Sequence, residues 1–310
     1  MTLQRHMARS RLAVYYELTK PKIWYLLVFT AIGGLVAASN IYQIEVSAAT
    51  WLLAIFSVAA GSAAANTLTN YHDRDIDGKM ERTKSRPLPS GRISPPVKAR
   101  NFGYALAAAS LVLAWGISYT ATPIQGALAT AFIGFGLFNN IIVYSYLLKR
   151  RSQFNIILGG LCGGSPPLVG WVAVTTADLW TMGMVLAGLV FVWIPLHIWS
   201  LTMRYRDDYN RVDVPMLTAV RSESTSARVI AASTLAMVAF SLVPLFLTAG
   251  GAPASGMVYA VTALASGALM VAISGWVVAR PTERAAWTLF KFSSPYLAVL
   301  FIGIMVDTAL

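Results

Sequence analysis

Charged residues are scarce in this chain of 310 residues. Asp, Glu, Lys and Arg together make up 12% of it, whereas an average soluble domain has about 25%. Hydrophobic residues make up 56%. Too few polar side chains remain to cover a water-exposed surface, so we expect a membrane protein. A nucleic-acid-binding function is not expected, because no soluble basic domain is left to carry it.

Cysteine is almost absent. Cys162 is the single cysteine and lies within an apolar run, which excludes a disulfide within the chain and any CxxC metal site. A removable signal peptide is also not expected. The segment Met1 to Lys22 is basic, but no small-residue cleavage site follows a short apolar core there.

Long apolar runs dominate the sequence. A helix must supply about 20 apolar residues to cross a hydrocarbon core about 30 Å thick. Runs of this kind predict an all-α, polytopic membrane protein, a bundle of about nine transmembrane helices forming a single domain over residues 1–310. The predicted spans are 22–39, 49–71, 102–121, 124–147, 155–176, 179–203, 229–249, 254–279 and 288–307.

Positive charge is missing from every second connection between these spans. All 24 Lys and Arg residues, Arg5 and Arg9 among them, lie at or before the start of span one or after spans two, four, six and eight. Because basic loops stay in the cytoplasm, we expect a multi-pass protein of the cell membrane with a cytoplasmic N-terminus and an outer C-terminus. Attraction to anionic lipid headgroups is an alternative reason for these charges.

Two cytoplasmic loops, at about 72–101 and 204–228, are long and open with clustered acids. We expect them to carry the catalytic residues. If span two continues as a helix into the first loop, its polar side chains recur every three or four residues on one face. This stripe consists of Asn66, Asn70, Asp73, Asp77 and Glu81.

Acids at a membrane boundary are costly and normally face a cavity or a partner. Two carboxylates one turn apart, with amide oxygens behind them, suit Mg²⁺, which shares the phosphate oxygens of a substrate. The alternative is a solvated helix end whose basic neighbours simply pair with the acids. Downstream, Arg82, Lys84, Arg86 and Arg92 crowd a loop rich in proline. Basic groups beside a metal-carboxylate cluster are suited to stabilise a departing diphosphate.

A second cluster closes span six. His197, Arg204 and Asp208 share one face of a continuous helix, while Asp207 points about 100° away. We therefore rank Asp208 above Asp207 as the inward-facing acid. His197 lies inside the apolar segment, where it is either a packing residue or a functional one.

A third cluster lies after span four, where Tyr146 and Lys149 are one turn apart. The basic residues here have an alternative interpretation as a topological stop signal. Glycines from Gly159 to Gly164 and the pair Pro166 and Pro167 are then expected to break span five, as happens where helices pack closely or open a cavity.

These segments resemble a known family. NYHDRDIDGKMERTKSRPLPSG resembles the first aspartate-rich motif of UbiA-type intramembrane prenyltransferases, and within them the subfamily that farnesylates heme. YSYLLKRRSQFNIILGGLCGGSPPLVGW and WIPLHIWSLTMRYRDDYNRVDVPML are similar to later signatures of that subfamily. Two positions depart from its pattern. Thr69 stands where asparagine is common, and Asp213 stands where glycine is usual.

The resemblance implies a helical bundle that encloses a cavity, with Mg²⁺ and diphosphate at its cytoplasmic end and an isoprenoid tail inside. It implies metal ligation by Asn70, Asp73 and Asp77, and by Asp208 at a second acidic site. It implies catalytic roles for the acids and for Arg82, Arg86 and Lys149. The residues expected to bind substrate are Asn70, Tyr146, Arg150, His197 and Arg204, and His197 is expected to bind the heme.

The implied reaction begins with farnesyl diphosphate bound through Mg²⁺ at Asp73, Asp77 and Asp208. Ionisation gives an allylic cation, a vinyl group of protoheme IX attacks it, and water quenches the product cation. Heme is thus a substrate rather than a cofactor. Membrane lipids are expected partners, and other heme-pathway or terminal-oxidase assembly proteins are further candidates.

Three alternatives remain open from the residues. Another prenyltransferase of this fold, acting on a quinone precursor or a glycerol lipid, would keep the diphosphate motifs without needing His197. A transporter of an anionic substrate would also place polar stripes in the membrane, but would need acids reachable from both faces. A structural heme- or lipid-binding subunit would have no use for the carboxylates.

Overall fold

The computed structural model describes residues 10–310, so Arg5, Arg9 and the signal-peptide prediction up to Arg9 lie outside the described residues. Eight helices of the described part are long and apolar enough to cross a membrane, some with a 3₁₀ or π-helical turn attached. Their α-helical cores are α2 (Pro21–Tyr42), α3 (Ala48–His72), α5 (Val97–Gly116), α6 (Pro123–Phe138), α9 (Met184–Arg204), α12 (Glu223–Phe240), α13 (Met257–Ala279) and α14 (Glu283–Asp307).

Shorter elements complete the bundle. The short α-helices are α1 (Arg11–Leu18), α4 (Arg74–Asp77), α7 (Asn155–Gly159), α8 (Ser165–Val172), α10 (Arg206–Arg211) and α11 (Leu217–Val220). The 3₁₀ turns are η1 (Ile117–Tyr119), η3 (Gly160–Gly164) and η5 (Val243–Phe246), and the π-helical segments are η2 (Asn139–Leu148) and η4 (Leu179–Gly183). Two strands, β1 (Thr248–Ala249) and β2 (Ala252–Pro253), pair antiparallel in a hairpin.

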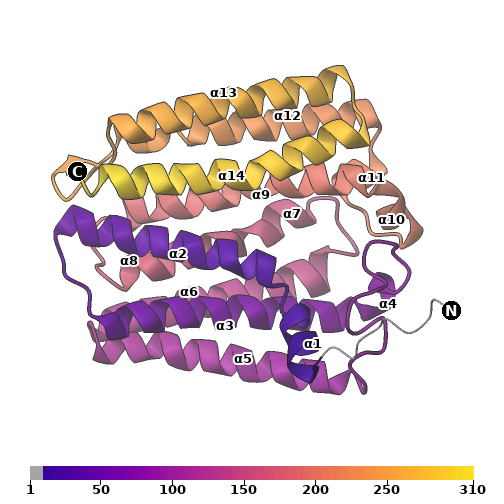
Figure 1. The fold of residues 1–310 in the computed structure, drawn as a ribbon, viewed down its shortest axis with the longest axis horizontal. Helices are drawn as coiled ribbons and strands as arrows, with labels where there is room; N and C mark the ends of the chain where they lie inside the picture. Colours follow the sequence, from indigo (N-terminus) through magenta and orange to yellow (C-terminus); the bar gives the residue numbers. More distant parts are fainter. Residues whose placement is uncertain (1–9) are drawn as a thin grey trace.

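The predicted fifth span is the broken one. In place of a continuous fifth span, α7, η3 and α8 follow one another over residues 155–172, and Figure 1 shows α7 and α8 toward opposite ends of the bundle. Eighteen helical residues rise about 27 Å, close to the hydrocarbon thickness of about 30 Å. The prediction that glycines and prolines break this span is confirmed.

The helix boundaries follow local chemistry. Hydroxyl side chains cap α3, α6, α12 and α14 at their first turns, which satisfies N–H groups that have no partner inside the helix. Lys20 precedes α2 in a left-handed conformation, with φ 53°, and Pro21 begins the helix. Proline suits this position because its missing N–H would be unpaired there in any case.

The bundle has two halves. Helices α2, α3, α5, α6 and α8 pack together, and α9, α12, α13 and α14 form the other group, joined to the first chiefly through α2, α8 and η3. The first group is held by close backbone contact: a Cβ on Gly170 would lie 1.9 Å from the carbonyl oxygen of Ala31, and one on Gly34 would lie 2.3 Å from that of Pro167. Small residues at helix crossings allow such approach in membranes.

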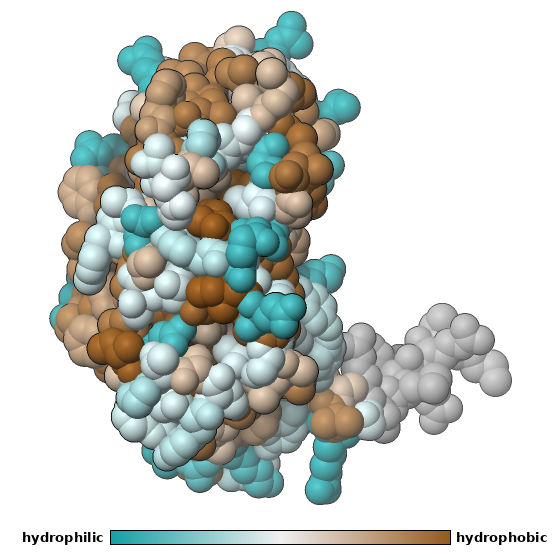
Figure 2. All heavy atoms as spheres, turned by 90° about the vertical axis from the view of Figure 1, so that its left-hand side faces the viewer, coloured by the Kyte–Doolittle hydropathy of each residue, from teal (hydrophilic) through white to brown (hydrophobic). Residues whose placement is uncertain are grey.

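The two ends of the bundle differ. Helices α1, α4, α10 and α11 gather at one end, and the C-terminus lies at the other (Figure 1). Figure 2 looks at the second end and shows hydrophilic and pale residues mixed with hydrophobic ones. Asp178 ties the loops together there, because it accepts hydrogen bonds from the Tyr42 hydroxyl and, at 3.1 Å, from the Gly250 N–H.

The prediction of continuous helices through the acidic clusters is wrong at two points. α3 ends at His72, with Asp73 as its C-cap, and α9 ends at Arg204, where Tyr205 (φ −114°, ψ 33°) separates it from α10. Glu81 lies in a turn and pairs with Lys84 at 2.5 Å. Both helices therefore end beside the candidate site instead of passing it.

Candidate active site

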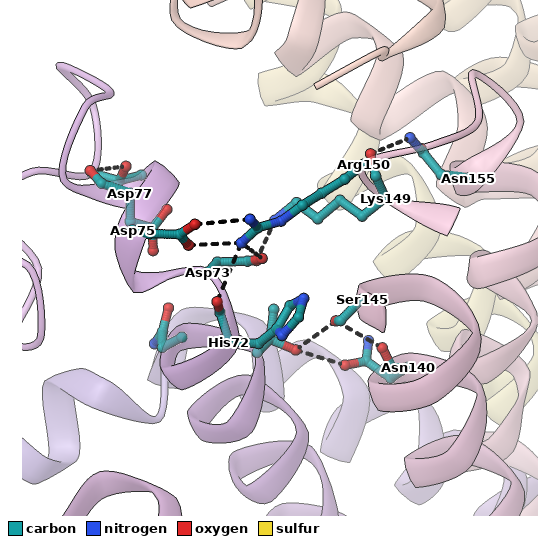
Figure 3. A network of polar contacts seen from close by, with 12 residues as sticks. His72, Asp73, Asp75, Asp77, Asn140, Ser145, Lys149, Arg150 and Asn155 are labelled. Carbon is teal, nitrogen blue, oxygen red and sulfur yellow. Dashed lines mark hydrogen bonds and ion pairs between the residues drawn. The ribbon is translucent and has the colours of Figure 1, made fainter. Parts of the chain in front are cut away.

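Asp73 lies at the centre of a buried ion-pair cluster at the α1, α4 and α10 end of the bundle. Its side chain is 2% exposed and forms an ion pair with Lys149. Arg150 Nη2 lies 3.8 Å from Asp73 Oδ1, while the guanidinium holds Asp75 through two hydrogen bonds of 2.7 and 2.8 Å. Figure 3 shows the side chains of Lys149 and Arg150 extending toward Asp73 and Asp75. The structure thus brings span two and the loop after span four together.

Lys149 is held in its charged form. Burial by itself would lower the pKa of Lys149, but attraction to Asp73 and Tyr144, the hydrogen bond to Asp73 and attraction to Tyr209 together outweigh burial and raise that pKa. Lys149 follows the π-helical segment η2, in which its N–H bonds the carbonyl oxygen of Tyr144 at 2.8 Å. Segments of π-helix are rare and occur mostly at functional sites.

The extra residue per turn also changes which tyrosine accompanies Lys149. Tyr144 lies beside it, with its ring centroid 5.8 Å from Lys149 Nζ. Tyr146, which the sequence singled out, is 50% exposed and lies against His72, with ring centroids 4.1 Å apart and planes tilted by 35°. The sequence missed Tyr144 because α-helical spacing was assumed.

Asp77 forms the second acidic position. It is 3% exposed and accepts a 2.7 Å hydrogen bond from Arg86 Nη1. The same nitrogen lies 3.5 Å from Asn70 Oδ1, and Asn70 Nδ2 donates to the Leu18 carbonyl oxygen at 2.8 Å. The predicted residues Asn70, Asp77 and Arg86 therefore lie together, with Asn70 and Asp77 buried and Arg86 partly exposed.

Lys20 is a cation of this site that the sequence reasoning missed. It is half-buried, and the pKa of its amine is lowered, first by burial and then by the nearby positive charges of Arg86 and Lys149. Asp77 and Asp73 oppose that shift only in part. The available signal was its position, directly before Pro21 at the start of span one and at the same membrane boundary as the acids.

Asp208 of α10 binds the backbone at the start of the basic loop, the segment after α4 that carries Arg82 and Arg86. Its two carboxylate oxygens accept the backbone N–H groups of Glu81, at 2.8 Å, and Arg82, at 3.0 Å. Asp208 is buried, whereas Asp207 and Asp213 are exposed, so the ranking of Asp208 above Asp207 as the inward acid is confirmed. The two departures from the family pattern also have local explanations. Asp213 adopts φ 52°, a conformation that glycine takes without strain, and the Thr69 hydroxyl bonds Asn140 Oδ1 at 3.1 Å.

Two further arginines, Arg82 and Arg204, belong to the predicted site. Arg82 donates to the Tyr209 hydroxyl at 3.3 Å and lies 5.3 Å from the Tyr205 ring centroid, while its Nε is buried without a hydrogen-bond partner. Arg204 forms an ion pair with Glu283 of α14. Arg82 thus has donor capacity left for an anion, and Arg204 already holds a carboxylate.

Asn66 lies deeper, one turn below Asn70, and lines a cavity of about 100 Å³. α2, α3, α6, η2, η3 and α8 contribute its walls, which include the side chains of Asn140, Cys162 and Ser165. This cavity lies within the first half of the bundle, next to the ion-pair cluster along α3.

His197 lies away from the acids, at the contact between α9 and α14. Its ring is stacked between Trp193, at 4.2 Å, and Phe290, at 4.3 Å. Its Nδ1 lies 2.7 Å from the Ser293 hydroxyl oxygen. Because α9 ends at Arg204, His197 and Asp208 belong to different helices, and the shared face predicted for them does not form.

The buried acids keep acceptor atoms that a metal ion could use. Within residues 10–310 no three His, Cys, Asp or Glu side chains lie close enough to hold a metal unaided. Asp73 Oδ1 is nevertheless buried and accepts no hydrogen bond. Two buried carboxylates and an amide oxygen are the donors that Mg²⁺ takes when phosphate oxygens complete its shell. The residues therefore fit Mg²⁺ bound together with a phosphate-bearing substrate.

Comparison with known proteins agrees with this geometry. The model of the UbiA prenyltransferase family matches residues 26–296. Protoheme IX farnesyltransferase 2 of Cenarchaeum symbiosum (strain A) is 70% identical over 309 residues, covering 99% of both chains. Protoheme IX farnesyltransferase of Thermoplasma volcanium is 41% identical, covering 96% of this chain and 98% of its own.

Two solved structures share the fold. Digeranylgeranylglyceryl phosphate synthase has a TM-score of 0.72 at 20% identity and covers 96% of this chain and 98% of its own. A UbiA homologue from Archaeoglobus fulgidus bound to GPP and Mg²⁺ has a TM-score of 0.57 at 16% identity and covers 94% of this chain and 99% of its own. The chain therefore belongs to the UbiA prenyltransferase family, with protoheme IX farnesyltransferases as its full-length relatives.

Proposed function

We propose that this chain transfers the farnesyl group of farnesyl diphosphate to a vinyl group of protoheme IX and releases diphosphate. The observation that carries the proposal is the surplus of positive charge around two buried acids. Asp73 and Asp77 lie among Lys20, Arg86, Lys149 and Arg150. Such a cluster suits a polyanion, and the full-length relatives named for heme farnesylation supply the acceptor.

In this proposal Asn70, Asp73 and Asp77 hold Mg²⁺, which when bound offsets the charge of the leaving diphosphate. Lys149 and Arg86 are already aimed at the same carboxylates, so a small shift lets them bind the diphosphate oxygens. Arg82 adds its unpartnered Nε, and Arg150 adds a third guanidinium. Preorganised cations of this kind stabilise charge as it develops on a leaving group.

The proposed reaction has three chemical steps. The bond between C1 of the farnesyl group and the diphosphate oxygen breaks, and the diphosphate keeps the electron pair. The vinyl double bond of protoheme IX then attacks C1, forming a carbon–carbon bond and leaving a cation beside the porphyrin ring. Water adds there, and its proton passes to the released diphosphate. Tyr144 lies beside Lys149, and Tyr146 lies against His72, the residue before Asp73, so the face of either ring could shield the allylic cation.

His197 and Arg204 are proposed to bind the heme. His197 supplies a ring nitrogen within the membrane, and Arg204 supplies a cation that could exchange Glu283 for a carboxylate of the acceptor. Asp208 is proposed to hold the loop of Arg82. Each of its oxygens keeps a further lone pair beyond the backbone N–H that it accepts, so its role as a metal ligand stays a prediction, which Mg²⁺ titration tests.

We further propose that residues 1–310 act as one domain in the cell membrane, with loops 72–101 and 204–228 facing the cytoplasm. The distribution of Lys and Arg supports this orientation. A reporter fused after Leu310 is expected to be active outside the membrane, and one inserted at Gly91 inside. The opposite result would reverse the topology.

The test is conversion of heme and farnesyl diphosphate by purified protein, followed by mass spectrometry. Wild type is expected to add a farnesyl and a water to heme. Asp73→Ala and Asp77→Ala are expected to lose at least 100-fold in kcat/KM, about 2.7 kcal/mol, whereas Asp207→Ala, an exposed acid nearby, is the matched control. Wild-type rates in the Asp73 and Asp77 variants with Mg²⁺ limiting would overturn the metal assignment. Transfer to a quinone precursor or glycerol lipid, with none to heme, would overturn the acceptor.

A further inference from the structure

The hydrogen bonds around Ser293 determine which nitrogen of His197 carries its proton. The Ser293 hydroxyl donates to the Phe290 carbonyl oxygen, 2.7 Å away and in the same helix. A serine hydroxyl has only one hydrogen to give. With that hydrogen on the Phe290 carbonyl, the 2.7 Å contact between Ser293 Oγ and His197 Nδ1 has the histidine as donor. His197 therefore carries its proton on Nδ1 and keeps a lone pair on Nε2.

The surroundings favour the neutral ring. In the described part of the chain no carboxylate pairs with His197, and a lone charge in an apolar setting is costly. Trp193 and Phe290 cover both ring faces, so the ring cannot rotate freely. Trp193 is itself anchored, because its indole N–H donates to the Ser293 carbonyl oxygen at 2.7 Å. One serine thus fixes both the proton and the orientation of the ring.

The opposite edge of the ring carries Nε2. His197 is only partly buried, and Nε2 has no hydrogen-bond partner, yet it is not among the enclosed unpartnered atoms of the described residues. Neutral imidazole with a free, accessible nitrogen is the form that binds transition metals, and a hydrogen bond from the other nitrogen is the usual device that orients it. An unused Nε2 in a membrane helix of this chain points to a metal-bearing substrate.

We propose that Ser293 is a positioning residue that holds His197 as the Nδ1–H tautomer, so that Nε2 binds the iron of the heme acceptor. This inference rests on the proposed function for the identity of the acceptor. It adds to that function a defined ligand atom, a defined tautomer and a residue of α14 that contacts the substrate only through His197.

The test is optical titration of purified full-length protein with ferric heme, with no farnesyl diphosphate present. Wild type is expected to shift the Soret band to that of imidazole-bound heme. His197→Gly is expected to lose this band and to regain it with added imidazole, which shows that the folded site remains. His72→Ala is the matched histidine control. A wild-type band in His197→Gly, or its loss in His72→Ala, would overturn the ligand assignment.

Ser293→Ala separates positioning from packing. It is expected to weaken heme binding about tenfold, the lower end for loss of such an orienting partner, and Ser293→Thr is expected to restore it by keeping a hydroxyl. Ser274→Ala removes another buried serine hydroxyl, one that makes no hydrogen bond, and is expected to bind heme as wild type does. Wild-type affinity in a monodisperse Ser293→Ala preparation would refute the positioning role.

The two proposals fail separately. If wild type farnesylates heme but shows no imidazole ligation, the inference fails and the proposed function stands. If ligation is seen and depends on His197 but no farnesyl heme forms, the proposed function fails and the iron site stands.

Discussion

Asp208 accepts the backbone N–H of Arg82 at 3.0 Å, and with its other oxygen the N–H of Glu81 at 2.8 Å. Residues about 127 positions apart are thereby joined across the two halves of the bundle. The basic loop that carries Arg82 and Arg86 is fixed at its start by an acid from α10. Asp208, from the second acidic cluster, thus fixes the loop that lies beside the first cluster.

Replacing Asp208 by Asn tests that support. Asparagine offers one acceptor oxygen and sets its amide against the second N–H, which costs about 1–3 kcal/mol. We expect kcat to fall about tenfold or more, with an unchanged Mg²⁺ concentration for half-maximal activity. A large rise in that Mg²⁺ concentration would show instead that Asp208 binds the metal. Asp207→Asn, one residue away and exposed, is the control.

Lys20→Met should weaken binding of the diphosphate substrate. The loss of one charge-assisted hydrogen bond costs about 1.5–3 kcal/mol, so we expect KM for farnesyl diphosphate to rise about tenfold or more. The same change should not lower the melting temperature, because it removes a cation crowded by Arg86 and Lys149. Lys22→Met alters an exposed lysine two residues away and should leave KM unchanged. An unaltered KM in Lys20→Met would exclude Lys20 from the site.

Mg²⁺ alone is expected to bind poorly. The carboxylates are already neutralised by Lys149, Arg150 and Arg86, so a divalent cation gains little until an anion arrives. A ligand that binds the folded state raises its melting temperature by mass action. We therefore expect a thermal shift with Mg²⁺ plus diphosphate and almost none with Mg²⁺ alone. Chelation with EDTA should abolish transfer, and added Mg²⁺ should restore it. A full shift with Mg²⁺ alone would contradict this order of binding.

Gly170→Ala should destabilise the first half of the bundle. The added methyl would meet the Ala31 carbonyl oxygen at 1.9 Å, and backbone cannot move aside as a side chain can, so we expect a loss of about 3 kcal/mol or more. Gly275→Ala has nothing within 4 Å of its new methyl and should be neutral or stabilising by up to about 1 kcal/mol. Melting in detergent measures both. Equal melting temperatures would show that α2 and α8 can separate without cost.

Hydropathy predicted the spans closely, because length and apolar content determine which segments can lie in a bilayer. Predicted spans 49–71 and 124–147, for example, match the observed helices Ala48–His72 and Pro123–Leu148 within a residue. The acids of the first cluster and its partner Lys149 were also found from spacing and family resemblance.

What the sequence did not show depends on backbone geometry. α3 ends at His72 and α9 ends at Arg204 without a proline or glycine at either point, so the residue types do not mark these ends. The π-helical register of η2, which puts Tyr144 rather than Tyr146 beside Lys149, leaves no pattern of apolar residues to detect. Lys20 is separated from its neighbours in the site by more than fifty residues.

The break in the fifth span is bridged by one side chain. Asn139 donates to the Leu158 carbonyl oxygen and accepts the Cys162 N–H, each at 3.1 Å. It thus serves backbone groups on both sides of the helix interruption at Gly159 and Gly160. A variant that rebuilt a continuous helix there would free position 139 to become apolar, whereas losing Asn139 alone would leave the Leu158 carbonyl oxygen and the Cys162 N–H without this partner.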